Sequence, residues 1–324
     1  MSHRYLITGG AGFIGSNLIR HLLTVDSDAE VTNYDLLTYA GVEATVDELD
    51  QLPRHRFIKG DIRDADQVDE ALRDHDVVIH LAAETHVDRS IGTPTVFADT
   101  NVGGTAVLLE AAKRHGVKRF IHVSTDEVYG SVEDGYADEG APLRPTSPYS
   151  ATKAGADLLV LSYHRTFDLP VIVTRCTNNY GPYQFPEKVI PLFVTNLLDG
   201  RRVPLYGDGL NQRDWLHVDD HCRALHMLVG EGVAGEIYNI GAGAQISNLE
   251  LTRMILETFD LDESWIERVP DRPGHDFRYA VDSGRIRSLG WAPLTTLTDR
   301  LVETVDWFRG RRDWWEPLKR VMPR

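Results

Sequence analysis

Short runs of apolar residues alternate with longer amphipathic segments along the first half of the chain. The runs have the length of buried β-strands, and the segments between them repeat apolar positions at helical spacing. The predicted strands span residues 4–8, 30–35, 56–61, 76–83, 119–125 and 170–175, and the predicted helices span residues 13–23, 64–73, 101–115 and 147–167. Strict alternation of strand and helix predicts an α/β fold with a doubly wound parallel sheet and helices on both of its faces.

The composition of the sequence changes after about residue 177. The segment "NNYGPYQFPEKVIP", residues 178–191, is rich in proline, glycine and aromatic residues, as is typical of a folded binding loop. Residues 245–324 are predicted to be helical with intervening loops. These features predict a second, smaller C-terminal domain of mixed α/β structure.

The composition is that of a soluble globular protein with an acidic surface. Of the 324 residues, 42% are hydrophobic and 26% are charged, and 34 basic against 49 acidic residues give a formal net charge of −15. This balance argues against a nucleic-acid or anionic-membrane partner. No run of about 18 apolar residues, the length that a transmembrane helix needs, occurs in the chain. We therefore expect a cytoplasmic protein.

Cysteine and histidine spacing predicts neither a disulfide framework nor a metal site. The two cysteines, Cys176 and Cys222, lie far apart in the sequence, which fits a reducing compartment. His217 and His221 are four residues apart, but we interpret both as structural because they belong to a motif with another explanation. No metal is expected.

A glycine motif joins the first predicted strand to the first predicted helix. In "TGGAGFIGS", Gly9, Gly12 and Gly15 recur at every third position. Glycine lets the chain turn sharply and approach a pyrophosphate closely, and the helix N-terminus offers amide donors to the phosphates. Asp35 ends the second strand about 20 residues further on, where it can accept from a ribose and repel a 2′-phosphate. The motif predicts a Rossmann dinucleotide site, and NAD rather than NADP because no arginine follows Asp35 directly.

Two further motifs carry candidate reactive groups. In "SPYSATKAG", Tyr149 and Lys153 lie four residues apart and share one face of a helix. The Lys153 ammonium and a positive nicotinamide ring are expected to lower the pKa of the Tyr149 phenol, which makes it a usable base. In "HVSTDEVYGS", Thr125, Asp126 and Glu127 lie at the end of a buried strand. Neighbouring carboxylates with pKa values pushed apart supply one acid and one base.

Together these motifs resemble those of the extended short-chain dehydrogenases/reductases that act on nucleotide sugars, and within them those of the dTDP-glucose 4,6-dehydratase family. The resemblance covers nearly the entire chain. It rests on "LAAETHVDRSI", "STDEVYGS", "SPYSATKAG", "NNYGPYQFPEKVIPLF" and "RDWLHVDDHCRAL", which match that family in order and spacing. It implies an NAD-binding Rossmann domain of residues 1–177, which also receives about residues 214–243. Residues 178–213 and 244–324 would then form the sugar-nucleotide-binding domain.

The resemblance also implies a reaction and a role for each reactive residue. An NAD-dependent lyase of this family converts dTDP-glucose to dTDP-4-keto-6-deoxyglucose by oxidation at C4, elimination of water across C5 and C6, and reduction at C6. Tyr149 would take the proton of the 4-hydroxyl, Thr125 would hydrogen-bond that hydroxyl, and Lys153 would hold the nicotinamide ribose. Glu127 would take the C5 proton, and Asp126 would protonate the departing hydroxyl.

The residues expected to bind the two ligands lie along both domains. Those expected to bind NAD are Gly9, Gly12, Phe13, Ile14, Gly15, Asp35, Leu36, Thr38, Gly41, Asp61, Ile62, Leu81, Ala82, Ala83, Thr100, Tyr149 and Lys153. Those expected to bind the nucleotide sugar are Thr85, Asn178, Lys188, Val189, Pro204, Tyr206, Arg213, Asn248, Arg272 and His275. Phe277 departs from the family, which often has an arginine there. The resemblance further implies a homodimer formed through the helices near residues 101–115 and 147–167.

Other functions share part of this pattern. A nucleotide-sugar 4-epimerase or decarboxylase, or a 4,6-dehydratase for another nucleotide sugar, would also carry the glycine motif, Tyr149 and Lys153. The epimerases typically have small or hydroxyl residues in place of Asp126 and Glu127, so the acidic pair favours a dehydratase. An NAD-sensing regulator on the same fold often lacks the reactive tyrosine, which this chain keeps.

Overall fold

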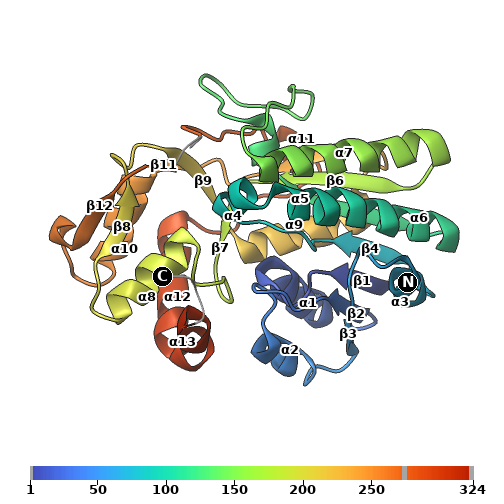
Figure 1. The fold of residues 1–324 in the computed structure, drawn as a ribbon, viewed down its shortest axis with the longest axis horizontal. Coiled ribbons are helices and arrows are strands. Elements are labelled where there is room, and N and C mark those ends of the chain that lie inside the picture. The colour runs from blue at the N-terminus through green and yellow to red at the C-terminus, as the bar shows by residue number, and fades with distance from the viewer. Residues whose placement is uncertain (1–2, 272–275, 321–324) are drawn as a thin grey trace.

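A seven-stranded, all-parallel sheet forms the centre of the larger part of the molecule (Figure 1). The computed structural model describes residues 3–271 and 276–320. From edge to edge the strands are β3 (His55–Lys59), β2 (Glu30–Asp35), β1 (Arg4–Thr8), β4 (Val77–His80), β5 (Arg119–Thr125), β6 (Val171–Cys176) and β10 (Ile237–Ile240). The chain winds outward in both directions from β1 and β4, which confirms the predicted doubly wound fold. This reversal opens a crevice at the carboxyl ends of β1 and β4.

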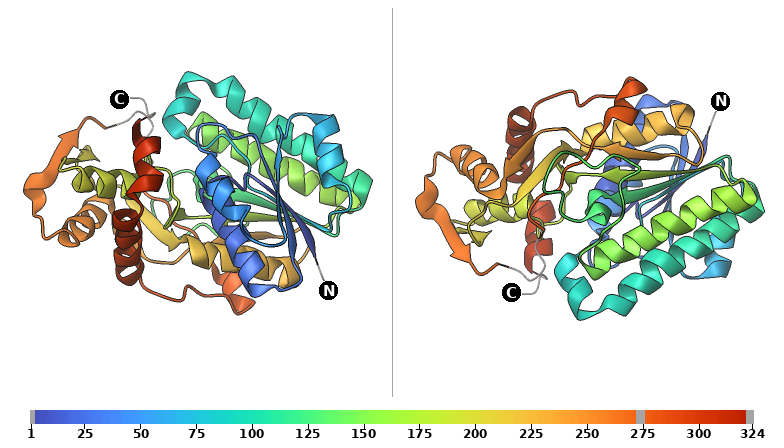
Figure 2. Two further views of the ribbon diagram at one scale, coloured as in Figure 1. Left: turned by 90° about the horizontal axis from the view of Figure 1, so that it is seen from below. Right: turned by 90° about the horizontal axis from the view of Figure 1, so that it is seen from above.

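Helices cover both faces of this sheet and bury a separate apolar core on each (Figure 2). On one face lie α1 (Phe13–Val25), α2 (Glu43–Leu49), α9 (Val218–Glu231) and α11 (Gly284–Ser288), and on the other α3 (Ala65–Leu72), α6 (Thr105–His115) and α7 (Pro148–Phe167). Leu18 and Leu225 belong to the first core, and Leu109 and Val160 to the second. The apolar spacing of these helices is therefore explained by burial against the sheet.

The smaller part of the molecule has two small sheets and a core of its own (Figure 1). The first sheet has the order β11 (Gln245–Ser247), β9 (Gln212–His217), β7 (Asn178–Tyr180), and the second pairs β8 (Val203–Tyr206) with β12 (Ile266–Val269). Around them lie α8 (Val189–Leu198), α10 (Asn248–Glu257), η3 (Glu263–Trp265), α12 (Leu297–Gly310) and α13 (Arg312–Arg320). Ile190, Leu251, Val305 and Trp315 are buried together in this third core.

Element boundaries differ from the predicted ones mainly near the crevice. The fourth strand ends at His80 rather than at residue 83, because residues 81–83 leave the sheet and line a cavity. The helix predicted from residue 101 begins with a wide π-helical turn, η1 (Ala98–Gly104), and continues as α6. Two short helices that no sequence pattern predicts, α4 (Val87–Gly92) and α5 (Pro94–Phe97), precede this turn. The other predicted strands and helices agree to within about two residues.

The start of α7 is set by its first residues. The Ser147 hydroxyl accepts from Ser150 N, and the Ser150 hydroxyl accepts from Ser147 N, both at 3.1 Å. This reciprocal cap, together with Pro148 at the first helical position, begins the helix at that point. Tyr149 consequently lies in the first turn of α7, beside the ends of the central strands.

Candidate active site

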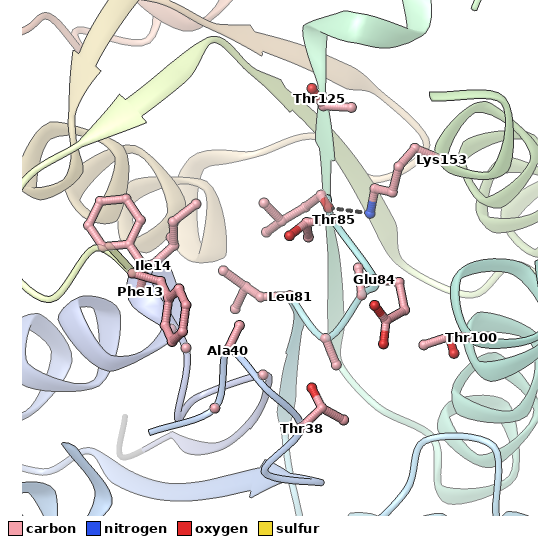
Figure 3. A pocket seen from close by; sticks show the side chains of 18 of the residues that line it. Phe13, Ile14, Thr38, Ala40, Leu81, Glu84, Thr85, Thr100, Thr125 and Lys153 are labelled. Carbon is pink, nitrogen blue, oxygen red and sulfur yellow. Dashed lines mark hydrogen bonds between the residues drawn. The ribbon is translucent and has the colours of Figure 1, made fainter. Parts of the chain in front are cut away.

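A cavity lies over the carboxyl ends of the central strands, at the point where the strand order reverses (Figure 3). Its walls come from the glycine loop, the ends of β2, β4, β5 and β6, the η1 turn and residues 176–188. In Figure 3, Phe13 and Ile14 lie on one side of the cavity, and Thr125 and Lys153 lie on the other. Open α/β sheets usually bind their ligands at this position.

The glycine loop forms a cradle that side chains would fill. Gly9 has a left-handed φ of +75°, and a Cβ there would lie 2.7 Å from Ala82 N. A Cβ on Gly15 would lie 2.3 Å from Gly9 O. Helix α1 begins after Gly12, and no side chain caps its first amides. A dinucleotide pyrophosphate fits this arrangement, because the backbone comes close and the amide donors are not taken by a cap.

Asp35 is held at the end of β2 by two backbone amides. Its Oδ1 accepts from Leu37 N at 2.8 Å, and its Oδ2 accepts from Ala11 N at 3.0 Å. Burial raises the pKa of this carboxyl, and the two amides oppose that shift. Arg63 lines the same cavity but is paired with Asp61 at 2.6 Å. An acid held in place and an arginine already engaged favour a ribose hydroxyl over a 2′-phosphate.

The remaining residues expected to bind NAD lie in the same place. Every one of them, from the glycine loop through residues 81–83 to Thr100 and Lys153, lines the cavity. They come from six separate stretches of the chain, which the parallel sheet brings together at one edge. The geometry is therefore compatible with the predicted site as a whole.

Thr125, Asp126 and Glu127 lie where β5 enters the cavity. The Thr125 hydroxyl accepts from Glu127 N and donates to Asp126 Oδ1, both at 3.3 Å, and the chain continues as the 3₁₀ turn η2 (Asp126–Tyr129). Asp126 is buried, whereas Glu127 is partly exposed. Burial first, and the charge of Glu127 second, raise the pKa of Asp126 well above its usual range. The raised pKa of Asp126 is compatible with its expected role as the acid, and burial contributes more to the shift than repulsion does.

Tyr149 and Lys153 reach the same wall of the cavity from α7. Lys153 Nζ donates to Val123 O at 2.8 Å (Figure 3), and burial lowers the pKa of Lys153 to about 8. The expectation that the Lys153 ammonium and a positive nicotinamide ring together lower the pKa of Tyr149 stays a prediction for the NAD-bound protein. Burial raises that pKa well above its usual range, and Glu127 and Asp126 add to the shift. A phenolate at this position needs the positive charge of an oxidised nicotinamide.

The residues expected to bind the nucleotide sugar fall into three groups. Thr85, Asn178 and Lys188 line the cavity. The others that the structure describes lie outside its lining: Val189, Pro204, Tyr206, Arg213 and Asn248. Arg272 and His275 lie outside the described residues. The cavity therefore contains three of the expected residues, and the five described residues outside its lining lie on the smaller part of the molecule.

Arg213 is buried in β9, close to the reactive acids. Its guanidinium donates to Asp276 O at 2.9 Å and lies 4.2 Å from the centre of the Tyr279 ring. Its positive charge lowers the pKa of Asp126 against the effect of burial. Phe277, where the family often has an arginine, is 53% exposed.

Two residues in or beside the cavity are not among those that the sequence identified. Glu187 lines the cavity, and its Oε1 accepts from Tyr39 OH at 3.1 Å, which ties the binding loop to the loop after β2. Asn101 in η1 is buried; its Oδ1 accepts from Glu84 N at 2.9 Å, and its Nδ2 donates to Glu84 O at 3.1 Å. A polar residue within an aromatic loop was the available signal for Glu187, and Asn101 had none.

Within residues 3–271 and 276–320, no group of histidine, cysteine, aspartate and glutamate side chains is placed to hold a metal ion. Cys176 and Cys222 are both free and buried. None of the helices in this described part of the chain has the length and apolar character to cross a membrane.

Comparison with known proteins agrees with the motif resemblance. The sequence profile of the family described as GDP-mannose 4,6 dehydratase matches residues 6–304. A dTDP-glucose 4,6-dehydratase of Streptomyces niveus is 54% identical over 321 residues, which cover 98% of this chain and 96% of that protein. The low-salt glycan biosynthesis protein Agl12 of Haloferax volcanii is 52% identical over 305 residues, which cover 94% of this chain and 98% of that protein.

Among the solved structures, a dTDP-glucose 4,6-dehydratase is more similar to this chain than a 4-epimerase is. The dTDP-glucose 4,6-dehydratase DesIV of Streptomyces venezuelae, determined with NAD and a second ligand bound, is 54% identical with a TM-score of 0.94, covering 97% of this chain and 99% of that chain. The UDP-glucose 4-epimerase of Thermus thermophilus, in complex with NAD, is 32% identical with a TM-score of 0.88, covering 95% and 99%. The chain belongs to the GDP-mannose 4,6-dehydratase family, and several of its relatives at about half identity are named dTDP-glucose 4,6-dehydratases.

Proposed function

We propose that this chain is an NAD-dependent hydro-lyase that converts dTDP-glucose to dTDP-4-keto-6-deoxyglucose and water. The observation that carries the proposal is the presence of Asp126, Glu127 and Tyr149 in one cavity with a dinucleotide cradle. Oxidation followed by water loss needs a base for an oxygen, a base for a carbon and an acid for the leaving group. Relatives at 54% identity carry this activity in their names, and the epimerase structure is less similar.

NAD fits the cavity as the resident cofactor. Gly9 and Gly15 would hold its pyrophosphate, Asp35 its adenosine ribose and Lys153 its nicotinamide ribose. When bound, NAD accepts a hydride from C4 of the sugar and later returns it to C6. Two related dehydratase structures contain NAD, which supports the assignment.

The residues of the chain move the protons. Tyr149 takes the proton of the 4-hydroxyl, and Thr125 hydrogen-bonds the same oxygen. The 4-keto group that results makes the C5 proton acidic, and Glu127 takes it. Asp126, buried and protonated, gives its proton to the 6-hydroxyl, which leaves as water. Glu127 returns its proton to C5 when C6 is reduced, so the acid and the base act on opposite ends of one carbon–carbon bond.

Incubation of the purified protein with dTDP-glucose tests this function. We expect a 4-keto sugar, detected by its alkali-induced absorbance, and no product from Glu127→Gln. Formation of dTDP-galactose would identify an epimerase and overturn the proposal. Titration with dTDP, UDP, GDP and CDP addresses the nucleotide separately, and dTDP is expected to bind most tightly.

We also propose the domain division implied by the resemblance: residues 1–177 with about 214–243, and residues 178–213 with 244–324. Helix α9 and strand β10 support it, because they belong to the core and the edge of the large sheet. Helices α8, α10 and α12 share the third core instead. Thr85, Asn178 and Lys188 are proposed to contact the sugar from the cavity wall, and the other expected residues to hold the nucleotide.

A cytoplasmic homodimer formed through α6 and α7 is the proposed assembly. These two helices lie side by side on the outside of the molecule (Figure 2). Leu158 and Phe167 of α7 are 60% and 47% exposed, and Val96 of α5 is 40% exposed, which is apolar surface that a partner would cover. Light scattering should give the mass of a dimer for the native chain and of a monomer for Leu158→Glu. A monomeric native chain would contradict the assembly.

A further inference from the structure

The proposed reaction leaves two groups, Tyr149 and Asp126, in protonation states from which the next turnover cannot start. Tyr149 begins as phenolate and ends with the proton of the 4-hydroxyl. Asp126 begins as the acid and ends as carboxylate, because its proton departs in the water. Glu127 gains a proton and returns it. Since the overall reaction neither consumes nor releases a proton, one proton has to pass from Tyr149 to Asp126 in every cycle.

Thr125 lies between the two groups. Its hydroxyl donates to Asp126 Oδ1 at 3.3 Å and accepts from Glu127 N at 3.3 Å. The same hydroxyl interacts with the Tyr149 phenol and lowers its pKa against the effect of burial, and both side chains line the same cavity. A hydroxyl has one proton to donate and two lone pairs that accept. The bonds to Asp126 and Glu127 N use the proton and one lone pair, which leaves the second lone pair for the substrate 4-hydroxyl or, when no substrate is bound, for the Tyr149 phenol.

Exchange of these protons with water is restricted. Asp126 is 3% exposed, and Thr125 and Tyr149 are each 8% exposed. Asp126 Oδ2 is buried and has no hydrogen-bond partner among the described residues, whereas Oδ1 accepts from the Thr125 hydroxyl. The carboxyl thus has one oxygen held by Thr125 and one that no described protein group engages.

We propose that Thr125 is a proton relay that resets the site between turnovers, an inference that rests on the proposed function. The O–H bond of Tyr149 breaks, and its proton joins Thr125 Oγ1. The proton that Thr125 held moves to Asp126 Oδ1, and a half-turn of the carboxyl presents it to the substrate side. No electrons move, and the products are the phenolate and the acid with which the cycle began.

The charges around Tyr149, Thr125 and Asp126 favour proton transfer from the phenol to the carboxyl. Burial and the charge of Glu127 raise the pKa of Asp126, so the carboxyl holds the proton that arrives. Burial raises the pKa of Tyr149 as well, so the transfer is favoured only when Lys153 and the oxidised nicotinamide stabilise the phenolate. That condition is met after reduction of C6, when the nicotinamide is oxidised again.

Rapid-quench kinetics of Thr125→Val with dTDP-glucose test the relay. We expect the ratio of the steady-state rate to the first-turnover rate to be at least tenfold lower than in the native chain. The reason is that the return of a proton to Asp126 then depends on solvent. Thr125→Ser keeps the hydroxyl and should behave as the native chain does. Imidazole, a small proton carrier, should restore the steady-state rate of Thr125→Val.

Thr125→Ala is the second variant, since the space it leaves admits imidazole more readily. Equal slowing of the first turnover and the steady state, without rescue by imidazole in either variant, would mean that Thr125 acts on the substrate hydroxyl alone and would overturn the relay. Absence of a 4-keto product from the native chain would instead overturn the proposed function, and it is recorded before the variants are compared.

Discussion

Replacement of Asp126 by asparagine should separate oxidation of the sugar from loss of water. The amide has nearly the shape of the carboxyl, and its oxygen can still accept from the Thr125 hydroxyl. It has no acidic proton for the departing 6-hydroxyl. Because the position is buried, a water molecule cannot easily take over this role.

The size of the effect follows from the role of the residue. General acid catalysis contributes about 10²- to 10⁴-fold to a rate. Each tenfold step corresponds to about 1.4 kcal/mol, so the barrier to elimination should rise by about 3–5 kcal/mol. Oxidation at C4 depends on Tyr149 and Lys153, which this substitution leaves in place. Elimination should therefore become much slower than the oxidation that precedes it.

Stopped-flow absorbance of reduced nicotinamide measures both steps of Asp126→Asn. After mixing with dTDP-glucose we expect reduced cofactor to accumulate and then decay at the slow rate of elimination. Asp134→Asn, at an exposed aspartate nearby, is the matched control and should show the native time course. If reduced cofactor appears as slowly as the final product in Asp126→Asn, this residue acts on oxidation, and the assignment of the acid is refuted.

Three further predictions concern the cofactor and the buried charges. Gly15→Ala should lower NAD affinity about 100-fold, because its Cβ would meet a backbone oxygen of the glycine loop at 2.3 Å. Gly230→Ala is the control, since nothing lies within 4 Å of the new Cβ. Calorimetric titration with NAD measures both variants. NAD affinity should fall as the pH rises through about 8, since the pKa of Lys153 is lowered to about 8 and the ammonium is present only below it; an affinity that does not change across this range contradicts the contact with the ribose. Arg175→Met should destabilise the protein by about 3–5 kcal/mol in denaturant unfolding, because buried Asp157 loses its partner at 2.8 Å. The double variant with Asp157→Leu should recover most of that loss, and equal losses in both would show that the pair is not the cause.

Local patterns predicted the large sheet and many of the residues that line the cavity. A buried parallel strand is recognised in the sequence as a short apolar run. The glycine loop and Asp35 could be assigned to a cofactor site because they lie at the ends of two such strands. The parallel topology then brings every strand end to one edge, so residues predicted one at a time meet in one cavity.

Contacts between distant segments could not be predicted in this way. Glu48 in α2 accepts from Tyr183 OH at 2.6 Å and from Arg20 Nη2 at 3.0 Å, and it also contacts Arg311. These four residues connect α1 and α2 to the loop of residues 178–191 and to the residue that follows α12. No spacing in the sequence identifies them, because each lies on a different element.

The pKa of Tyr149 shows a second limit. The spacing of Tyr149 and Lys153 correctly predicts that they share a wall of the cavity. It cannot predict how deeply the phenol is buried, and burial is the largest influence on its pKa. The effect of a neighbouring charge was read from local sequence, whereas desolvation is a property of the completed fold.

The path of one hydrogen tests the central claim most directly. The proposed function requires the hydrogen on C4 of dTDP-glucose to move within the active site to C6, while the C5 position exchanges with solvent through Glu127. With dTDP-glucose deuterated at C4, in ordinary water, nuclear magnetic resonance of the product should show deuterium at C6 and none elsewhere. Deuterium that remains at C4, or that is lost to the solvent, would contradict it.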